Sequence, residues 1–302
     1  MTEPQPGGQT PGEPPANPYA PPANPYAPPA NPYAPQQYPP QYPSYPPAPP
    51  TPAPVEHPLL YRGAPETLER AVAEGRPVKA AGWGFPDFLI TLALWFFFSL
   101  VSALIAVVLF GDQELKLPAS ILVALTMPWI GLAGWPLLVS WWKGNGPIID
   151  FGVTWRWMDL VWGLVYGLVA LVLAAGIAWG TTAIFGEFDS AAGELASDMD
   201  SMVSLVAFGV LVGIGAPIVE ELAFRGLLFG SLAKRGMPIW FTILVSGGIF
   251  SLFHFEPIRI PLLMSTGLVL AFARYQQRSL TVPIVAHMVN NIPAAIALVL
   301  MS

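Results

Sequence analysis

The segment from Ser204 to Ala233 reads SLVAFGVLVGIGAPIVEELAFRGLLFGSLA, an apolar run interrupted by charge. The run is long enough to cross a bilayer, which takes about 20 residues. In its middle, Glu220, Glu221 and Arg225 place three ionisable side chains within six residues. A charged side chain at the bilayer centre costs from about 2.5 to more than 10 kcal/mol, so such residues usually mark a functional site. The segment therefore predicts both a membrane span and the place where function resides.

The composition extends this apolar character to the whole chain. Hydrophobic residues make up 54% of it and charged residues 11%, whereas an ordinary soluble domain is about 25% charged. The net charge of −6 offers no basic surface for nucleic acid. There is no cysteine, which excludes disulfides, thiolate metal sites and a cysteine nucleophile. We expect a protein that contacts membrane lipids and does not bind nucleic acid.

The apolar runs predict about seven membrane spans, and hence an all-α, polytopic membrane helical bundle over residues 81–302. The spans are expected near residues 86–110, 118–142, 160–183, 203–222, 238–255, 262–277 and 280–300, the fourth continuing as helix to about 234. Tryptophans flank the second loop and are typical of an interfacial belt. They are Trp141, Trp142, Trp155, Trp157 and Trp162.

The distribution of charge predicts an orientation in the cytoplasmic membrane. With seven spans, the basic residues fall on one side, which the positive-inside rule assigns to the cytoplasm together with the amino terminus. They are Arg62, Arg70, Arg76, Lys79, Lys143, Arg156, Lys234, Arg235, Arg274 and Arg278. The opposite side takes Ser302 and an acidic run that we interpret as a solvated loop. That run contains Glu187, Asp189, Glu194, Asp198 and Asp200.

Residues 1–80 are predicted to be a disordered cytoplasmic tail rich in proline and tyrosine. Residues 1–60 hold 23 of the 36 prolines, and ANPYAPP begins at Ala16 and Ala23, with ANPYAPQ at Ala30. Proline at this density favours polyproline II over helix or sheet. The tail is interpreted either as a spacer or as a ligand for a partner that binds proline-rich motifs.

Two further polar groups interrupt the apolar spans after Arg225. FSLFH ends at His254, and HMVNN places His287 and Asn291 four residues apart on one helix face. Taken singly, each group has a structural explanation, such as an ion pair or an interhelical hydrogen bond. Their expected depths agree, however. KRGMP breaks the helix near residue 237, and Glu220 and His254 each lie 17 residues from that turn, about 25 Å along a helix.

Two carboxylates, two imidazoles and an amide around a wet cavity suit hydrolysis. A carboxylate can take a proton from water, an imidazole can orient it, and N–H groups can stabilise an oxyanion. Other intramembrane hydrolase motifs are missing: the sequence contains no His-Glu-x-x-His, no Gly-x-Gly-Asp and no Gly-x-Ser-x-Gly. It contains Glu-Glu-x-x-x-Arg, Phe-x-x-x-His and His-x-x-x-Asn, in that order on successive spans.

This ordered set closely resembles the CAAX-protease and bacteriocin-processing (CPBP, or ABI) family of intramembrane proteases, over roughly residues 203–297. The resemblance implies an endopeptidase whose cavity opens to the cytosol. It implies that Glu220 activates water with help from His254, and that His287 and Asn291 form the oxyanion site. Glu221 and Arg225 would support them. The implied substrate is a membrane-tethered peptide or protein, with or without a lipid: prenylated Cys-a-a-X proteins, or bacteriocin and self-immunity peptides.

The metal requirement is open at this stage. Glu220, His254 and His287 would supply the His₂Glu set of some catalytic zinc sites, and a metal-free glutamate-activated water is also proposed for the family. The groups that surround the water are expected to lie roughly 3–7 Å apart. Glu221 should reach Arg225, leaving Glu220 to face the histidines. The alternative function is a non-proteolytic scaffold or transporter whose buried ionisable groups form an ion path, with the tail recruiting partners.

Overall fold

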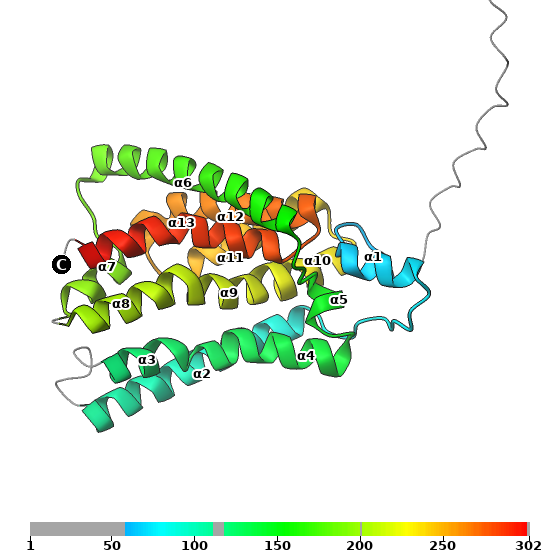
Figure 1. The fold of residues 1–302 in the computed structure, drawn as a ribbon, viewed down its shortest axis with the longest axis horizontal. Coiled ribbons are helices and arrows are strands. Elements are labelled where there is room, and N and C mark those ends of the chain that lie inside the picture. Colours follow the sequence, from blue (N-terminus) through cyan, green and yellow to red (C-terminus); the bar gives the residue numbers. More distant parts are fainter. Residues whose placement is uncertain (1–57, 111–117, 200, 301–302) are drawn as a thin grey trace, which may run out of the picture. The chain divides into compact units, whose positions relative to one another are not determined.

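The computed structural model describes residues 58–110, 118–199 and 201–300, and all regular structure in these ranges is helical (Figure 1). The described residues all belong to one compact unit. The predicted all-α membrane fold is confirmed. The repeats of the tail, residues 1–57, lie outside the described residues.

The helices follow one another with short connections. They are α1 (Glu66–Ala73), α2 (Phe85–Phe110), α3 (Pro118–Thr126), η2 (Ile130–Gly134), α4 (Trp135–Lys143), α5 (Pro147–Phe151), α6 (Trp157–Phe185), α7 (Ala191–Ser197), α8 (Met202–Val210), η3 (Leu211–Gly215), α9 (Ala216–Glu221), η4 (Leu222–Leu228), α10 (Phe229–Lys234), α11 (Ile239–Leu252), η5 (Pro257–Arg259), α12 (Ile260–Gln277) and α13 (Thr281–Leu300). Here η2, η3 and η4 are π-helical, and η5 is a 3₁₀ turn.

Six helices in the described part of the chain are long and apolar enough to cross a membrane. They are Phe85–Leu109, Val123–Lys143, Trp157–Phe185, Met202–Lys234, Pro257–Gln277 and Thr281–Leu300. The remaining predicted span, residues 238–255, corresponds to α11, whose 14 residues extend about 21 Å, less than the roughly 30 Å of a hydrocarbon core. Large apolar side chains on α2 and α6 are exposed, as a lipid-facing surface requires.

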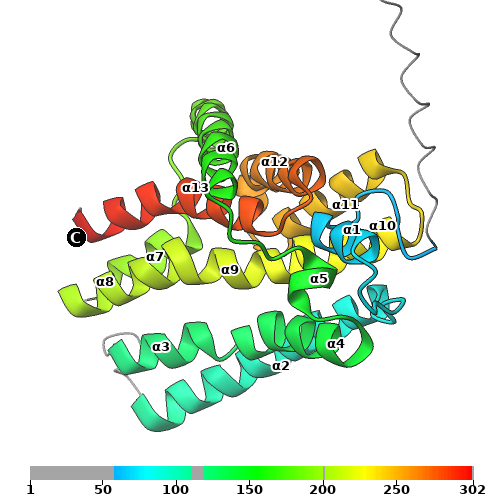
Figure 2. The ribbon, with the colours of Figure 1, turned by 45° about the vertical axis from the view of Figure 1, so that its right-hand side comes forward.

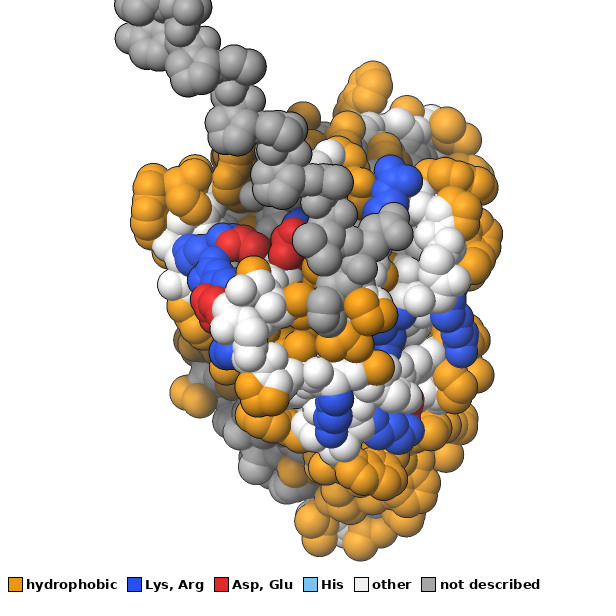
Figure 3. Space-filling model, turned by 90° about the vertical axis from the view of Figure 1, so that its right-hand side faces the viewer, with side chains coloured by type: hydrophobic (Ala, Val, Ile, Leu, Met, Phe, Trp, Pro, Cys, Tyr) orange, Lys and Arg blue, Asp and Glu red, His pale blue; other side chains and the backbone are white. Residues whose placement is uncertain are grey.

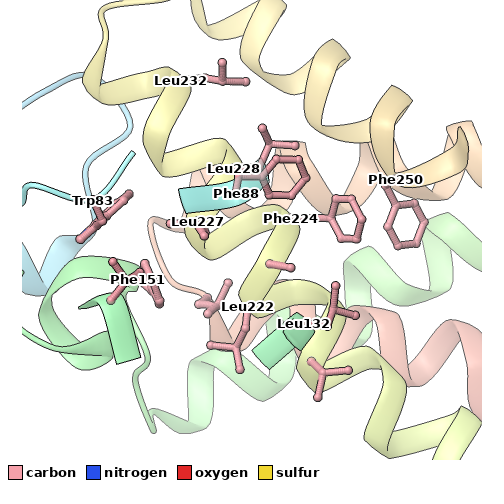
Figure 4. Close-up of a cluster of buried hydrophobic side chains, with 14 residues drawn as sticks. Trp83, Phe88, Leu132, Phe151, Leu222, Phe224, Leu227, Leu228, Leu232 and Phe250 are labelled. Atoms are coloured by element: carbon pink, nitrogen blue, oxygen red, sulfur yellow. The ribbon is translucent and has the colours of Figure 1, made fainter. Parts of the chain in front are cut away.

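The helices are arranged so that one long element is covered on two sides (Figures 1 and 2). The continuous run from α8 through α10 lies between the α2–α4 hairpin and a group formed by α6, α11, α12 and α13. Side chains of η4 fill the centre: Phe224, Leu227 and Leu228 are completely buried, and Phe88 of α2 and Phe250 of α11 pack on Phe224 (Figure 4). The charged stretch of the sequence thus lies in the core of the bundle.

Basic side chains gather at one end of the bundle, which we call the basic end (Figure 3). Backbone and side-chain contacts tie its segments together: Arg278 Nε donates to Ala64 O at 2.8 Å, and Lys234 Nζ donates to Ala81 O at 2.9 Å. Leu280 N bonds Gly152 O at 2.8 Å. The basic segments predicted to share one side therefore do share one end. The tryptophans of the second loop are exposed, as expected of a belt.

Residues 58–80 differ from the predicted disordered tail. Helix α1 buries Leu68 and docks on this basic end through ion pairs from Glu66 to Arg156 and from Glu69 to Arg278. Partial burial tends to raise the pKa of Glu66, but hydrogen bonds from Arg70 and Arg156 outweigh it, so the pKa lies below its ordinary value. The sequence signal is weak because α1 is short and three of its eight residues are charged, so that its tertiary contacts hold it in place.

The acidic run between α6 and α8 also differs from the predicted solvated loop. Residues 191–197 form α7, capped by Ser190, whose Oγ accepts from Gly193 N at 2.9 Å. Ala196 and Met199 are buried against Leu205 and Phe208 of α8. Apolar residues recur inside the run at helical spacing, as at Ala192, Ala196 and Met199, and indicate this helix. Asp200 lies outside the described residues.

Helices α11 and α12 cross closely because each has a glycine at the contact. A Cβ atom on Gly247 would lie 2.9 Å from Leu268 N and 3.0 Å from Gly267 C, both backbone atoms that cannot move independently. We expect Gly247→Ala to lower the unfolding free energy by about 1–3 kcal/mol, the usual cost of overpacking. Gly248→Ala is the control, since its Cβ would meet only Met264 Cε at 3.7 Å. Equal stability of the two variants in detergent unfolding titrations would contradict this account.

Candidate active site

The glutamates lie on α9 between two π-helical stretches. In η3 the backbone bonds run five residues back, as from Ala216 N to Leu211 O, and in η4 from Phe229 N to Phe224 O. The π geometry is rare and frequently marks functional sites. It rotates side chains around the helix axis relative to an ordinary α-helix. The directions in which Glu220 and Arg225 point therefore could not be predicted from the 3.6 residues per turn of an α-helix.

Asn291 of α13 compensates for the proline that begins this segment. In the register set by Ala216, the next backbone bond would run from residue 217 to Val212 O, and Pro217 has no N–H to make it. Asn291 Nδ2 donates to Val212 O instead, at 3.3 Å. Asn291 Oδ1 also accepts from Asn290 Nδ2 at 3.1 Å. Asn291 therefore fixes α13 against η3 and retains one further amide N–H.

A buried chain of charge-assisted hydrogen bonds joins Arg225, Glu221 and His287. Arg225 Nη1 donates to Glu221 Oε1 at 2.7 Å, and His287 Nδ1 contacts the same oxygen at 3.0 Å. The Arg225 and Glu221 side chains are 0% exposed. Arg225 Nη2 continues the chain to Gly267 O at 2.9 Å. The predicted pairing of Glu221 with Arg225 is confirmed.

One detail of the predicted geometry is wrong. We expected Glu220 alone to face the histidines, but Glu221 hydrogen-bonds His287, and Glu220 Oε2 lies 3.9 Å from His287 Nε2. The physical reason is that an imidazole has two nitrogens on opposite edges, so one ring can lie against two adjacent carboxylates. Because Glu221 is an acceptor when paired with arginine, Nδ1 of His287 carries a proton, and Nε2 of the neutral ring carries the lone pair.

His254 follows the end of α11 and is oriented by the backbone. Its Nδ1 lies 2.8 Å from Phe250 O, which can only accept, so Nδ1 holds a proton and Nε2 of the neutral ring is a free base. Phe255, one residue later, has a φ of 56°, which turns the chain sharply toward α12. Backbone geometry thus presents this imidazole at the start of a turn.

Phe250 holds the site together, a role that the sequence did not reveal. Its ring centroid lies 4.8 Å from that of His254 and 5.5 Å from that of His287, both edge to face. The Arg225 guanidinium carbon lies 4.5 Å from the same centroid. Edge-to-face and cation–π contacts of this kind are each worth about 0.5–2 kcal/mol. Phe250 therefore positions both imidazoles and the cation, as the first residue of Phe-x-x-x-His.

Glu220 opens into a cavity of about 380 Å³ between α2, the α3–η2 segment and the η3–α9 segment. Its side chain is 18% exposed, whereas that of Glu221 is fully buried. The cavity walls include Trp95 and Ser99 of α2 and Trp129 just before η2. Sequence reasoning missed these three residues, because an apolar span with a serine carries no signal of function by itself.

The metal hypothesis does not fit the arrangement. Within the described ranges, no group of three or more His, Asp or Glu side chains is arranged to hold a metal ion. Nδ1 of His254 faces Phe250 O and Nδ1 of His287 faces Glu221, which leaves Nε2 of each ring open, but these two rings and Glu220 do not form such a group. The predicted set of Glu220, His254 and His287 is thus not assembled as ligands, and we derive no step through a metal.

The fold and the site define a class: a polytopic membrane protein with a buried Glu–Glu–Arg–His constellation beside a cavity. Residues 202–293 match the model of the family described as Type II CAAX prenyl endopeptidase Rce1-like. The resemblance inferred from the three motifs is therefore confirmed for the segment that carries all of them.

Two curated proteins are similar over the same part of the chain. The "Membrane-embedded CAAX protease MroQ" of Staphylococcus aureus (strain USA300) is 36% identical over 89 residues, which cover 28% of this chain and 36% of that protein. The "Putative membrane peptidase YdiL" of Bacillus subtilis (strain 168) is 32% identical over 82 residues, or 27% and 33% of the two chains. The match thus spans about a third of each relative's length. No solved structure matches.

Proposed function

We propose that this protein is an intramembrane endopeptidase in which Glu220 activates a water molecule. The observation that carries the proposal is the 3.9 Å separation of Glu220 Oε2 and His287 Nε2 beside the cavity. With Glu220 ionised and the His287 ring neutral, both atoms are acceptors, so they cannot bond each other directly. A water molecule satisfies both by donating one O–H to each, and polar pairs farther apart than 3.5 Å are commonly bridged in this way.

The chemistry follows from that water. Glu220 takes one proton as the water oxygen attacks the scissile carbonyl carbon, and a tetrahedral oxyanion forms. The remaining N–H of Asn291 is the donor that we assign to the oxyanion, and His254 assists through its basic Nε2. Glu220 then returns the proton to the amide nitrogen as the C–N bond breaks. Arg225 and Glu221 keep His287 in the tautomer that accepts from the water.

The substrate that we propose is a membrane-tethered peptide or protein, cleaved near its carboxyl terminus or within its leader. A cavity among membrane spans supports this class, because a tethered chain is delivered to it from the bilayer. We place the basic end at the cytoplasmic face of the cell membrane, following the positive-inside rule. A reporter fused after Ser302 tests this orientation, and a cytoplasmic location of the reporter would refute it.

The proposal is tested by peptide cleavage with purified protein, using His254→Ala as the first variant. We expect kcat/KM to fall about 10²- to 10⁴-fold, the usual contribution of a positioned acid–base group. His57→Ala is the control, because His57 lies in the tail, outside the resemblance to the family. A zinc chelator is expected to leave cleavage unchanged. Full activity of His254→Ala, or loss on chelation with rescue by zinc, would contradict the mechanism.

A further inference from the structure

The cavity in front of Glu220 has the size of a side-chain subsite. Its volume of about 380 Å³ is near the lower end of the roughly 300–1,000 Å³ typical of ligand pockets. It therefore accommodates one or two side chains rather than a folded ligand. Trp95, Ser99, Ser102 and Trp129 on one side of it lie before residue 202, outside the segment that matches the protease family.

The two indoles of this wall are held against the elements that carry the candidate catalytic groups. Trp129 lies against Gly215: a Cβ there would fall 2.3 Å from Trp129 Cη2, so only glycine leaves room for the ring. Trp95 lies with its ring centroid 4.4 Å from that of Phe253, the residue before His254. The wall is therefore fixed relative to Glu220 on one side and His254 on the other.

The polar groups of the lining are mostly committed to the protein itself. Ser99 Oγ donates to Trp95 O at 2.8 Å, and Ser102 Oγ donates to Val123 O at 3.0 Å. Glu220 is the one charged residue among those that line the cavity in the described structure. A charged or strongly polar substrate side chain would thus lose its hydration without gaining partners, whereas an apolar one would bury its surface.

We propose that this cavity is a specificity subsite for one large apolar or aromatic side chain of the substrate, next to the scissile bond. The inference rests on the proposed function and deepens it, since it assigns substrate selection to α2 and the segment before η2. Because such a side chain is buried in the cavity, we expect kcat/KM to be about 10- to 100-fold higher for a substrate with leucine or phenylalanine at this position than for one with alanine.

The first test probes the cavity without any substrate. Because the chain has no cysteine, Ser99→Cys carries a single thiol in the cavity wall. Leu100→Cys, whose native side chain is 57% exposed, carries one on the outer face of the same helix. Purified variants are treated with benzyl and pyrenylmethyl methanethiosulfonates. We expect the benzyl reagent to react at least tenfold faster than the pyrene reagent at residue 99, and the two to be within about threefold at residue 100. No reaction at residue 99, or equal rates there, would overturn the subsite.

The second test compares the residues found beside cleaved bonds in a peptide library. Trp129→Ala enlarges the cavity and is expected to shift the preference toward larger apolar side chains. Ile130→Ala, at a neighbour that is 51% exposed and does not line the cavity, is expected to keep the wild-type preference. An unchanged preference in Trp129→Ala overturns the inference while proteolysis itself stands. Absence of cleavage by the wild type, with the labelling pattern intact, overturns the proposed function and leaves an apolar binding cavity.

Discussion

Glu220→Gln is expected to reduce peptide cleavage by at least about a thousandfold while leaving the bundle folded. A general base contributes roughly 10²- to 10⁴-fold, and an amide cannot accept the proton at all. The amide N–H₂ can also donate directly to His287 Nε2, which lies 3.9 Å from Glu220 Oε2 in the native protein, and so displace the bridging water. Because the side chain is 18% exposed and isosteric, we expect the unfolding free energy to change by less than about 1 kcal/mol.

The matched control is the same substitution one residue later. Glu221→Gln changes a fully buried carboxylate that accepts from both Arg225 and His287, so it should lose stability as well as activity. Cleavage rates and unfolding titrations of the two variants are measured in the same detergent. If Glu220→Gln cleaves as well as the wild type, Glu220 is not the base. If both variants lose stability equally, the different roles that we assign to the adjacent glutamates are wrong.

The sequence predicted the fold well because the bilayer imposes length and apolarity on each span. It predicted α8 through α10 as one helix, and the helix break at KRGMP, since Gly236 has a φ of 73° and Pro238 precedes α11. It overestimated disorder around α1, which is held by ion pairs between residues far apart in the chain. Such pairs leave no periodic signal.

The candidate site was predicted as a set of residues, but its geometry was not. Polar side chains in apolar spans are conspicuous, so Glu220, Glu221, Arg225 and His287 could be identified singly. The π-helical register and the rotamer of His287 decide which carboxylate each nitrogen faces, and neither follows from residue spacing. Trp95 and Trp129 gave no signal because an indole in an apolar span is unremarkable until a cavity is seen beside it.

Arg225→Met is expected to have the largest effect on stability. The substitution keeps an unbranched apolar side chain but leaves Glu221 buried without its cation and Gly267 O without its donor. Removing one partner of a buried ion pair costs about 3–5 kcal/mol, and the loss of the cation–π contact with Phe250 adds to this. Arg259→Met is the control: its pair with Glu256 is partly exposed, and exposed pairs are worth about 1 kcal/mol or less.

The double variant Arg225→Met with Glu221→Gln separates the electrostatic cost from lost packing. Neutralising the stranded carboxylate should recover part of the stability lost in Arg225→Met, since a neutral amide is far cheaper to bury than a charge. Activity should not return, because His287 no longer has a carboxylate to hold the proton on Nδ1. Additive losses in the double variant would mean that Glu221 and Arg225 act independently. Recovery of cleavage would show that the Glu221–His287 contact is not required. The hydrogen bonds that link Arg225 through Glu221 and His287 to the attacking water would then have no role in the chemistry.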